Sequence, residues 1–515
     1  MGKGFADGHS PDEIMLMAAD PREWLPPGHL AWKVIELAGE MDLSGFGAGY
    51  RADGQGGRPY RPRMMVTLIL YCYCRGRRSA REIEGATWDD VGARIIAGGL
   101  HPDHSTVARF TGRHQDAVLR LLPASVKACA AEGLVDLDVV AGDGTMLKAS
   151  AAMGATVTAA ELDAQIAELE AWISADVAGW VQDMLAAEGA PPAASSGGDD
   201  GSGGDDGGTS RKKKWKEKPG RAGQMLQRRL EARARLLDAA GDSAAPRIAE
   251  LARLAAKREA TLRRHEEEAR GRIAARAARE AAGKTIPGRR PVTDVSQDRG
   301  VRKARASLDR TRAALDGTAR QAVLDAKVNT TDPSSRIMPL KKGGYDQLFN
   351  VQALATARTQ VILAVTRHPS PADTCALPPL LAAARDVLAA AGVPGRIARA
   401  LFDAGYASDA NFTLDIPEDL WIATARTGTT RIRSALPSWQ DMSARLATPE
   451  GRDLYKKRAA TIEPVFAQLT QRLGRTLSFR GHLADAELAL WAASHNILKA
   501  ITARTRRLSH TPAAA

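Results

Sequence analysis

The sequence predicts a mixed α/β protein with a helical N-terminal part and a long helical insertion. The first 125 residues carry helical patterns, while apolar strand-like runs occur near residue 140 and again after residue 343. The stretch between these runs is helical and highly charged. Because strands and helices alternate in the last part, we expect one sheet packed against helices, with the charged stretch inserted into it.

Composition limits the classes of protein that fit. The 515 residues suit about two to four domains. A formal net charge of +12 and a pI near 9.6 favour a polyanionic partner, above all nucleic acid. Four cysteines are too few for a disulfide scaffold, and Cys72 and Cys74 are expected to be buried thiols, not zinc ligands. We find no signal peptide, and the longest apolar run (64–74) is short for a membrane span, so a cytoplasmic protein is expected.

The N-terminal helices have recognisable start signals. Pro62 opens an apolar helix over 62–74, and Ser79 with Glu82 forms a capping box ahead of the helical stretch 79–97. In the segment 101–114, Ser105 is expected to cap a short helix that carries Arg109 and Arg113 on neighbouring turns. A helix, a turn and a basic helix suit DNA binding, but an ordinary helical bundle with solvated arginines explains the pattern equally well.

The middle of the chain changes character twice. A strand over 135–147 is followed by an amphipathic helix over 158–185. The Gly-, Ser- and Asp-rich stretch 188–220 is expected to be a disordered linker that ends in the basic cluster 211–214, which either contacts DNA or is simply solvated. Residues 221–283 have no core-sized apolar face and predict a solvated hairpin or coiled coil, and 284–305 predicts a loop.

The last part of the chain predicts the sheet. Residues 343–369 are interpreted as two strands joined by a turn near Ala357 and Arg358. A helix is expected over 377–394, a strand leading into a loop and a helix over 395–412, and a further strand over 418–426. Two helices, 452–475 and 484–505, end the domain.

Three acidic residues stand out in this framework. In the stretch VVAGDGTMLKAS, Asp143 ends an apolar strand; Asp403 ends another, and Glu463 lies on a helix among basic residues. Asp and Gly are also ordinary turn residues, so each position alone has a structural explanation. Together, however, three carboxylates at one sheet edge can hold two Mg²⁺ ions about 4 Å apart for phosphoryl transfer. Asp136 and Asp138 compete for the first position, but they lie at the beginning of the strand, so Asp143 is preferred.

Several blocks in a fixed order carry a resemblance to a known family. They are RPYRPRMMVTLILYCYCRGRRSAREIE, HPDHSTVARF, VVAGDGTMLKAS, NTTDPSSRIMPLKKGGYDQLFNVQA, LFDAGYASDANF, YKKRAATIEPVF and GHLADAELALWAASHNILK. With them the chain resembles bacterial insertion-sequence transposases of the DDE class, and more narrowly the insertion-sequence 1182-type branch, related to the insertion-sequence 4 and 5 groups. The resemblance covers nearly the whole chain.

The resemblance implies a ribonuclease H-like catalytic core and a site within it. Asp143, Asp403 and Glu463 become the catalytic triad and the ligands of two Mg²⁺ ions, which Mn²⁺ can replace. Tyr455 and Arg458 occupy signature positions where phosphate contacts are expected. Thr470 stands where the family usually has Lys, which weakens the expected binding of element ends, and Arg472 and Arg475 are candidates to supply the missing charge.

The implied activity is cleavage of DNA at the ends of the insertion sequence and strand transfer to target DNA, without a covalent enzyme intermediate. The implied partner is double-stranded DNA, bound by a homodimer in a synaptic complex in the bacterial nucleoid region of the cytoplasm, with no membrane contact. Arg109 and Arg113 are the N-terminal candidates for DNA contact. Two alternatives remain: a metal-dependent nuclease of the same fold without strand transfer, and an inactive transposase relic that only binds DNA.

The expected domain boundaries follow from these assignments. Residues 1–125 form a helical domain that binds DNA ends, 126–155 the first core strand, 156–325 the helical insertion with the linker 188–220, 326–505 the remaining core, and 506–515 a disordered tail.

Other polar residues keep two interpretations. Asp332 before Pro333 is either a turn opener or part of a branch motif, and Asn350 and Gln352 either line the active-site face or are satisfied strand residues. We expect His495 and Asn496 to have packing or polar-network roles, and Trp172 and Trp180 to pack between helices.

Overall fold

The structure is a computed structural model that describes residues 20–47, 50, 59–188, 219–283, 292–340, 343–425, 434 and 436–510, without the side chains of 176–188, 219–221 and 510. The chain forms two compact units. One contains Met1–Ser150 and Arg336–Ala515, and the other contains Ala151–Ser335. The chain thus leaves the first unit after its first strand and returns to it 185 residues later.

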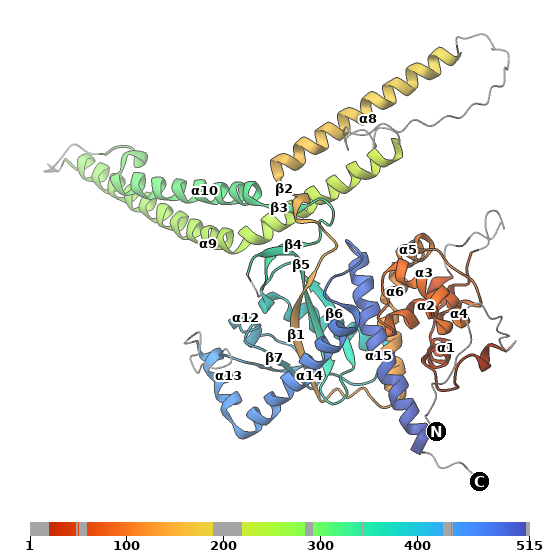
Figure 1. The fold of residues 1–515 in the computed structure, drawn as a ribbon. Helices are drawn as coiled ribbons and strands as arrows, with labels where there is room; N and C mark the ends of the chain where they lie inside the picture. The colour runs from red at the N-terminus through yellow and green to blue at the C-terminus, as the bar shows by residue number, and fades with distance from the viewer. Residues whose placement is uncertain are drawn as a thin grey trace, which may run out of the picture. The chain divides into compact units, whose positions relative to one another are not determined.

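The first unit contains a mixed six-stranded sheet (Figure 1). Its main path runs β4-β5-β1-β7-β8, and β6 pairs with β5 beside this path. β5 is antiparallel to β1, β4 and β6, whereas β7 is parallel to both β1 and β8. The mixed α/β class predicted from the sequence is confirmed. The strands are β1 (Val139–Lys148), β4 (Arg336–Pro339), β5 (Tyr345–Thr356), β6 (Ile362–His368), β7 (Arg399–Phe402) and β8 (Asp419–Ile422).

The position of Asp143 differs from the sequence prediction. Asp143 is the fifth residue of the ten-residue strand β1 and not its tip. The strand continues because β5 pairs with it as far as Lys148, and Asp143 lies opposite Ala353. On the other side, the parallel pairing with β7 ends at Ala141 and Leu401. At Asp143, therefore, β1 still pairs with β5, but on its other side the neighbouring strand β7 has already ended.

Alternation along the strands assigns side chains to the two faces of the sheet. Thr145, Leu147 and Val351 line a cavity with side chains of α14 (Pro449–Leu473) and α15 (Leu483–His510), so these helices cover the face to which Asp143 also belongs. Asn350 and Gln352 belong to the opposite face and are fully buried. The β5–β6 hairpin, with its turn after Thr356, confirms the two strands predicted for 343–369.

Short helices complete the part of the first unit around the sheet. α11 (Leu377–Ala391) follows β6 and ends at Gly392, whose φ of +65° suits a glycine at a helix end. It contacts β6 and β5. The remaining elements are η5 (Asp373–Cys375), α12 (Asp409–Phe412) and α13 (Pro437–Ala447).

The N-terminal helices belong to the same unit as the sheet. Pro62 opens α2, and the capping box of Ser79 and Glu82 is present at α3, as predicted. Cys72 and Cys74 are buried thiols, also as predicted. The elements are η1 (Pro21–Glu23), α1 (Leu30–Glu40), η2 (Ser44–Phe46), α2 (Pro62–Cys74), α3 (Ala80–Asp89), α4 (Val91–Ala97), α5 (His104–Arg113), α6 (Gln115–Leu119) and α7 (Leu121–Ala131).

The predicted cap of α5 is wrong by two residues. Asp103 is the N-cap, and its carboxylate accepts a hydrogen bond from the backbone N–H of Thr106. Ser105 lies inside the helix and donates its hydroxyl to Asp103. Asp and Ser are both good N-caps, so the sequence pattern alone could not separate them.

The second unit is built from long helices. η3 (Met153–Ala155) and β2 (Thr156–Thr158) precede α8 (Ala159–Glu188), and α9 (Pro219–Ala281) is one helix of 63 residues. α9 packs along α10 (Arg299–Asp325), which follows η4 (Val295–Gln297), and β3 (Lys327–Asn329) then pairs with β2 (Figure 1).

Two sequence predictions for this unit need correction. Residues 221–283 form no hairpin by themselves, because Pro246 lies within α9 without ending it, and the helical pairing is made with α10. The predicted loop 284–305 includes the start of α10. Most of the linker 188–220, with its basic cluster 211–214, lies outside the described residues, as do residues 511–515 of the predicted tail. The prediction of a disordered tail is wrong for residues 506–510, which continue α15 (Leu483–His510).

A small apolar core stabilises the second unit. Leu162 and Ile166 of α8 pack with Ala232 and Leu236 of α9 and with Val328 of β3. The predicted helix over 158–185 is thereby confirmed, with its apolar stripe facing α9. None of the helices in the described part of the chain is long and apolar enough to cross a membrane.

Candidate active site and nucleic-acid contacts

Two of the three predicted carboxylates lie side by side in the sheet. β7 ends at Phe402, so Asp403 follows at the level of Asp143 on the parallel strand β1. Burial, together with the nearby charge of Asp403, raises the pKa of Asp143 above its ordinary value. Each carboxylate also accepts a nearby backbone N–H, Asp143 from Gly144 at 2.7 Å and Asp403 from Gly405 at 2.8 Å. The pair is therefore held rigidly although its charges repel.

A cation on α14 partly compensates this repulsion. Arg458 Nη1 donates to Asp143 Oδ2 at 3.1 Å, and its Nη2 lies 4.0 Å from Glu463 Oε1. Burial acts to lower the pKa of Arg458, but Tyr455, Asp143 and Asp403 outweigh it and raise that pKa. Arg458 thus links the sheet carboxylates to the helix that carries Glu463.

Tyr455 supports the other side of the pair. Its hydroxyl donates to the carbonyl oxygen of Phe402 at 3.1 Å, directly before Asp403. Burial raises the pKa of Tyr455 to about 12, so the phenol stays protonated and keeps donating. In this structure Tyr455 therefore fixes the end of β7.

Glu463 has a different environment from the two aspartates. Its side chain is 65% exposed, compared with 23% for Asp143. Among the residues that the structure describes, no group of three or more His, Cys, Asp or Glu side chains is arranged to hold a metal ion. The structure thus brings Asp143 and Asp403 together and places Glu463 beside Arg458, outside their immediate group.

The helix around Glu463 is tied to the sheet through its proline. Pro464 has no N–H and cannot bond to the carbonyl of Ala460, which instead accepts from Gln360 Nε2 at 3.3 Å. Gln360 lies in the β5–β6 turn and has a φ of +60°, unusual for a residue with a side chain. The position of Glu463 is therefore coupled to this turn.

The structure reveals a polar network that the sequence did not indicate. Asp373 Oδ1 accepts from Gln352 Nε2 at 2.7 Å and from Asn350 Nδ2 at 3.0 Å, and Tyr406 donates to Gln352 Oε1. Asn350 and Gln352 are thus satisfied, buried strand residues. Asp373 does not directly follow an apolar strand in the sequence, so it carried no signal of its own. It lies after β6 in the chain, and the pairing of β6 with β5 brings it close to Asn350 and Gln352.

Two glycines let this network approach the carboxylate pair. A Cβ on Gly405 would lie 2.8 Å from Asp403 Oδ1 and 2.9 Å from Asp373 Oδ2. A Cβ on Gly144 would lie 2.5 Å from Gln352 Nε2 and 2.9 Å from Asp373 Oδ1. All four distances are shorter than a real Cβ atom allows, so Gly144 and Gly405 permit the close approach of Asp373 and Gln352 to the carboxylate pair.

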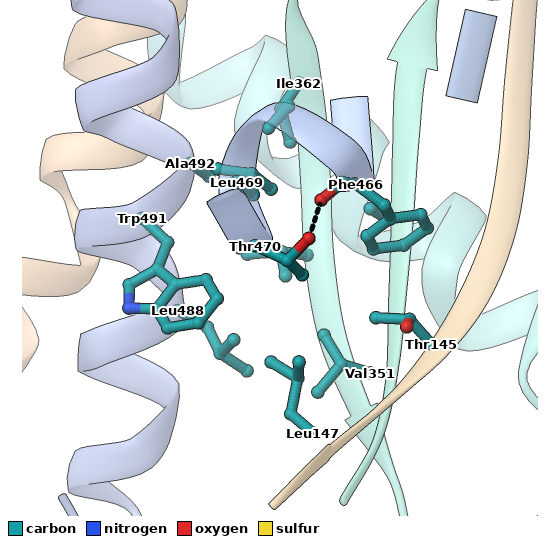
Figure 2. A pocket seen from close by; sticks show the side chains of 12 residues that line it. Thr145, Leu147, Val351, Ile362, Phe466, Leu469, Thr470, Leu488, Trp491 and Ala492 are labelled. Atoms are coloured by element: carbon teal, nitrogen blue, oxygen red, sulfur yellow. Dashed lines mark hydrogen bonds between the residues drawn. The ribbon is translucent and has the colours of Figure 1, made fainter. Parts of the chain in front are cut away.

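Thr470 faces the interior of the unit. It lines a small, largely apolar cavity between α14, α15 and the sheet, together with Phe466 and Leu469, and its hydroxyl donates to the Phe466 carbonyl at 2.8 Å (Figure 2). A lysine here would have to bury its ammonium group or extend past these side chains. The threonine is therefore explained by packing in this chain.

The remaining DNA-contact candidates are spread over the unit. Arg109 folds back onto its own helix and donates to the Ser105 carbonyl at 3.2 Å, while Arg113 lies over the ring of Tyr50. Arg475 is exposed, and Arg472 lines a cleft beside α15. Arg109 and Arg113 thus lie on α5, Arg472 lies in the last turn of α14, and Arg475 follows that helix.

The other polar candidates have structural partners. Asp332 accepts from the backbone of Ser334, as expected for a turn. Asn496 bonds both backbone groups of Ile362, and His495 Nε2 donates to the Gln360 carbonyl at 2.9 Å. Asp138 pairs with Arg399 at the start of β7, and Asp136 accepts from the backbone of Asp138. Trp172 is partly buried on α8, and the side chain of Trp180 lies outside the described part.

Comparisons with known proteins agree with this picture. Residues 19–113 match a family described as a transposase domain (DUF772), and residues 424–501 match a family described as a transposase DDE domain. The second match includes Tyr455, Arg458 and Glu463. No curated protein and no solved structure matches the chain. The two domain matches support a DDE-type insertion-sequence transposase, an enzyme that acts on DNA.

Proposed function

We propose that this chain is a transposase that cuts DNA at the ends of its insertion sequence and joins those ends to target DNA. The catalytic residues are Asp143, Asp403 and Glu463, in a ribonuclease H-like core of the insertion-sequence 1182-type branch. The observation that carries the proposal is the adjacency of Asp143 and Asp403 on parallel strands, with Arg458 reaching from the DDE-domain segment to Asp143.

The donor set fits a hard divalent cation such as Mg²⁺. Two neighbouring carboxylates, one of them with a raised pKa because of burial and its neighbour, provide oxygen ligands whose repulsion a cation would relieve. Glu463 is exposed and lies 4.0 Å from Arg458 on the same helix, and it is the third carboxylate that we propose for this site. When bound, such ions activate the attacking oxygen and stabilise the leaving oxygen in an in-line displacement at phosphorus.

The chain's own groups position the reactants. Asp143 is fixed by the backbone of Gly144 and by Arg458, and Asp403 by Gly405 and by the Tyr455 anchor on Phe402. Such fixed geometry favours an in-line attack because little reorganisation is needed. Arg458 has further N–H groups with which to contact a phosphate oxygen of the scissile strand.

DNA recognition is assigned to the N-terminal helices. Arg109 and Arg113 lie on α5, which ends the segment that matches a transposase domain. Phosphate contacts by such residues give salt-dependent affinity. Two element ends must be cut together, so we propose a homodimer in a synaptic complex with double-stranded DNA.

The test is an assay of cleavage and joining. Labelled DNA carrying the inverted repeats that flank the gene is incubated with the full chain and a target plasmid, in Mg²⁺ or in EDTA. Nicked ends together with joined products, both only in Mg²⁺, support the proposal. Cleavage without joining would favour a nuclease, and binding without cleavage in Mg²⁺ or Mn²⁺ would favour an inactive relic.

A further inference from the structure

A basic cleft lies beside the last two helices of the first unit. It has a volume of about 460 Å³ and is lined by residues of α14, of α15 and of the β5–β6 turn. Four of the lining residues are cations: Arg358, Arg472, Lys499 and Arg506. Among the described residues that line it, none is Asp or Glu. The cleft therefore concentrates positive charge in a concave site.

The two faces of α15 differ in how their cations are neutralised. Arg504 donates to Glu36 at 3.1 Å, to Glu40 at 2.7 Å and to Glu132 at 2.8 Å, and Arg507 also pairs with Glu132. These arginines join α15 to the N-terminal helices. On the cleft side, Lys499 instead donates to the neutral amide oxygen of Gln360 at 3.0 Å. On this side the charge of Lys499 thus faces a neutral group and not a carboxylate.

Arg472 gives the strongest indication of a ligand. Its Nε and Nη2 atoms are buried and have no hydrogen-bond partner. Burial lowers the pKa of Arg472, and it lowers that of Lys499 as well. A buried cation is costly to desolvate, and because these two atoms are covered, an anion in the cleft would stabilise Arg472 through its charge. The cleft is therefore better suited to an occupied state than to an empty one.

We propose that this cleft binds a backbone phosphate of DNA, as a contact separate from the catalytic carboxylates. The inference rests on the proposed function, which supplies the DNA. Arg472 follows Arg458 by fourteen residues on the same helix, which is about 21 Å along the axis, or about six base pairs of duplex, and about four helical turns bring the two positions back to nearly the same side. A duplex whose phosphate contacts Arg458 therefore reaches the cleft within one turn of the double helix.

The alignment on α14 explains why this contact is made by Arg472 and not at position 470. Thr470 lines the apolar cavity of Figure 2, whereas Gln468 and Arg472 line the basic cleft. Residues 468 and 472 are four apart and share one face of the helix. A phosphate contact from this part of α14 therefore requires a cation at 472.

The test measures DNA binding without Mg²⁺, so it does not depend on catalysis. Fluorescence anisotropy with a labelled duplex of mixed sequence gives Kd over a series of NaCl concentrations. The variants are Arg358→Gln, Lys499→Gln and the double variant. The matched control is Lys127→Gln, because Lys127 lines another cleft together with Glu40 and Asp42, where charges are balanced. Thermal unfolding confirms that each variant is folded.

We expect each cleft substitution to reduce the slope of log Kd against log salt by about 1 and the double variant by about 2. The control should keep the wild-type slope. An unchanged slope in the double variant would overturn the proposal. A second arm titrates inorganic phosphate at constant ionic strength by calorimetry. Phosphate binding that is lost in Lys499→Gln while the DNA slope stays unchanged would show a site for free phosphate and overturn the assignment to DNA.

If wild type fails to cleave DNA but these slopes change as expected, the proposed function fails and the binding site stands. If wild type cleaves DNA but the slopes are unchanged in the variants, the proposed function stands and the assignment of the cleft to DNA fails. The two failures are therefore distinguishable.

Discussion

Arg458 donates to Asp143 at 3.1 Å and lies 4.0 Å from Glu463, so one guanidinium connects the sheet carboxylates to the helix. Asp143 on β1 and Asp403 directly after the parallel strand β7 lie at the same level of the sheet, and Arg458 is a cation near both of them. This arrangement leads to predictions about metal binding, packing and stability.

Replacing Arg458 should make the protein depend more on divalent metal for stability. In Arg458→Gln, Asp143 loses its cation, and the repulsion between Asp143 and Asp403 is no longer compensated. Because the Arg458–Asp143 ion pair is partly exposed, the free energy of unfolding should fall by about 1–3 kcal/mol. Adding Mg²⁺ should then raise the unfolding temperature of the variant more than that of wild type. Lys456→Gln, two residues away and exposed, is the control. An equal Mg²⁺ effect in all three proteins would contradict the role of Arg458.

Gly405→Ala should reduce cleavage without unfolding the protein. The added Cβ would approach oxygens of Asp403 and Asp373 to 2.8 and 2.9 Å, so one of these carboxylates must move. Small displacements of this kind lower rates by about 10- to 100-fold. Single-turnover cleavage measures the effect. Gly85→Ala on α3, where nothing lies within 4 Å of the new Cβ, serves as control, and full activity of Gly405→Ala would refute the packing argument.

Asp373→Ala should destabilise the sheet-containing unit. Asn350 and Gln352 each lose one hydrogen-bond acceptor, which should lower the free energy of unfolding by about 1–2 kcal/mol. Asp373→Asn keeps an oxygen acceptor and should shift the urea midpoint less. Asp386→Ala removes an exposed carboxylate from α11 and should have almost no effect. Equal midpoints for Asp373→Ala and Asp386→Ala would mean that the network contributes nothing to stability.

The buried His495 should make stability depend on pH. Burial lowers the pKa of His495 to about 4, so the folded protein holds it neutral while the unfolded chain protonates it at its ordinary value. The contribution of neutral His495 to the free energy of unfolding is fully present above the pKa that it has in the unfolded chain. This contribution is lost as the pH falls toward the lower pKa of His495 in the folded protein. Between about pH 7 and about pH 5 the loss is about 2 kcal/mol. In His495→Gln this part of the pH dependence should disappear from urea-unfolding curves, and an unchanged dependence would contradict it.

Much of the fold could be predicted from local patterns. The capping box at Ser79, the proline start of α2 and the β5–β6 hairpin are short-range signals, and the structure contains all three. The strand predicted over 135–147 ends within one residue of β1 but begins four residues too early. That Asp143 lies in the middle of β1 and not at its tip depends on pairing with β5, which lies about 200 residues away in the sequence. Of the two alternatives predicted for 221–283, a hairpin or a coiled coil, the hairpin is wrong because α9 is one helix and its partner is α10.

The candidate site shows the same division. The acidic residues Asp143 and Asp403 were identifiable because each follows an apolar run, and parallel pairing of β1 and β7 brings them together. Asp373 and the basic cleft lack such local patterns. Their members come from segments that only tertiary packing unites, as with Arg358 in a turn and Lys499 on the last helix.

The most direct test of the account compares Asp143→Asn with Asp136→Asn in the cleavage assay. Both substitutions remove one negative charge from neighbouring positions, but only Asp143 lies beside Asp403 and Arg458. The account predicts that Asp143→Asn loses Mg²⁺-dependent cleavage by about 1000-fold or more while DNA binding stays within about twofold, and that Asp136→Asn behaves like wild type. Normal cleavage by Asp143→Asn would contradict the assignment of the catalytic site.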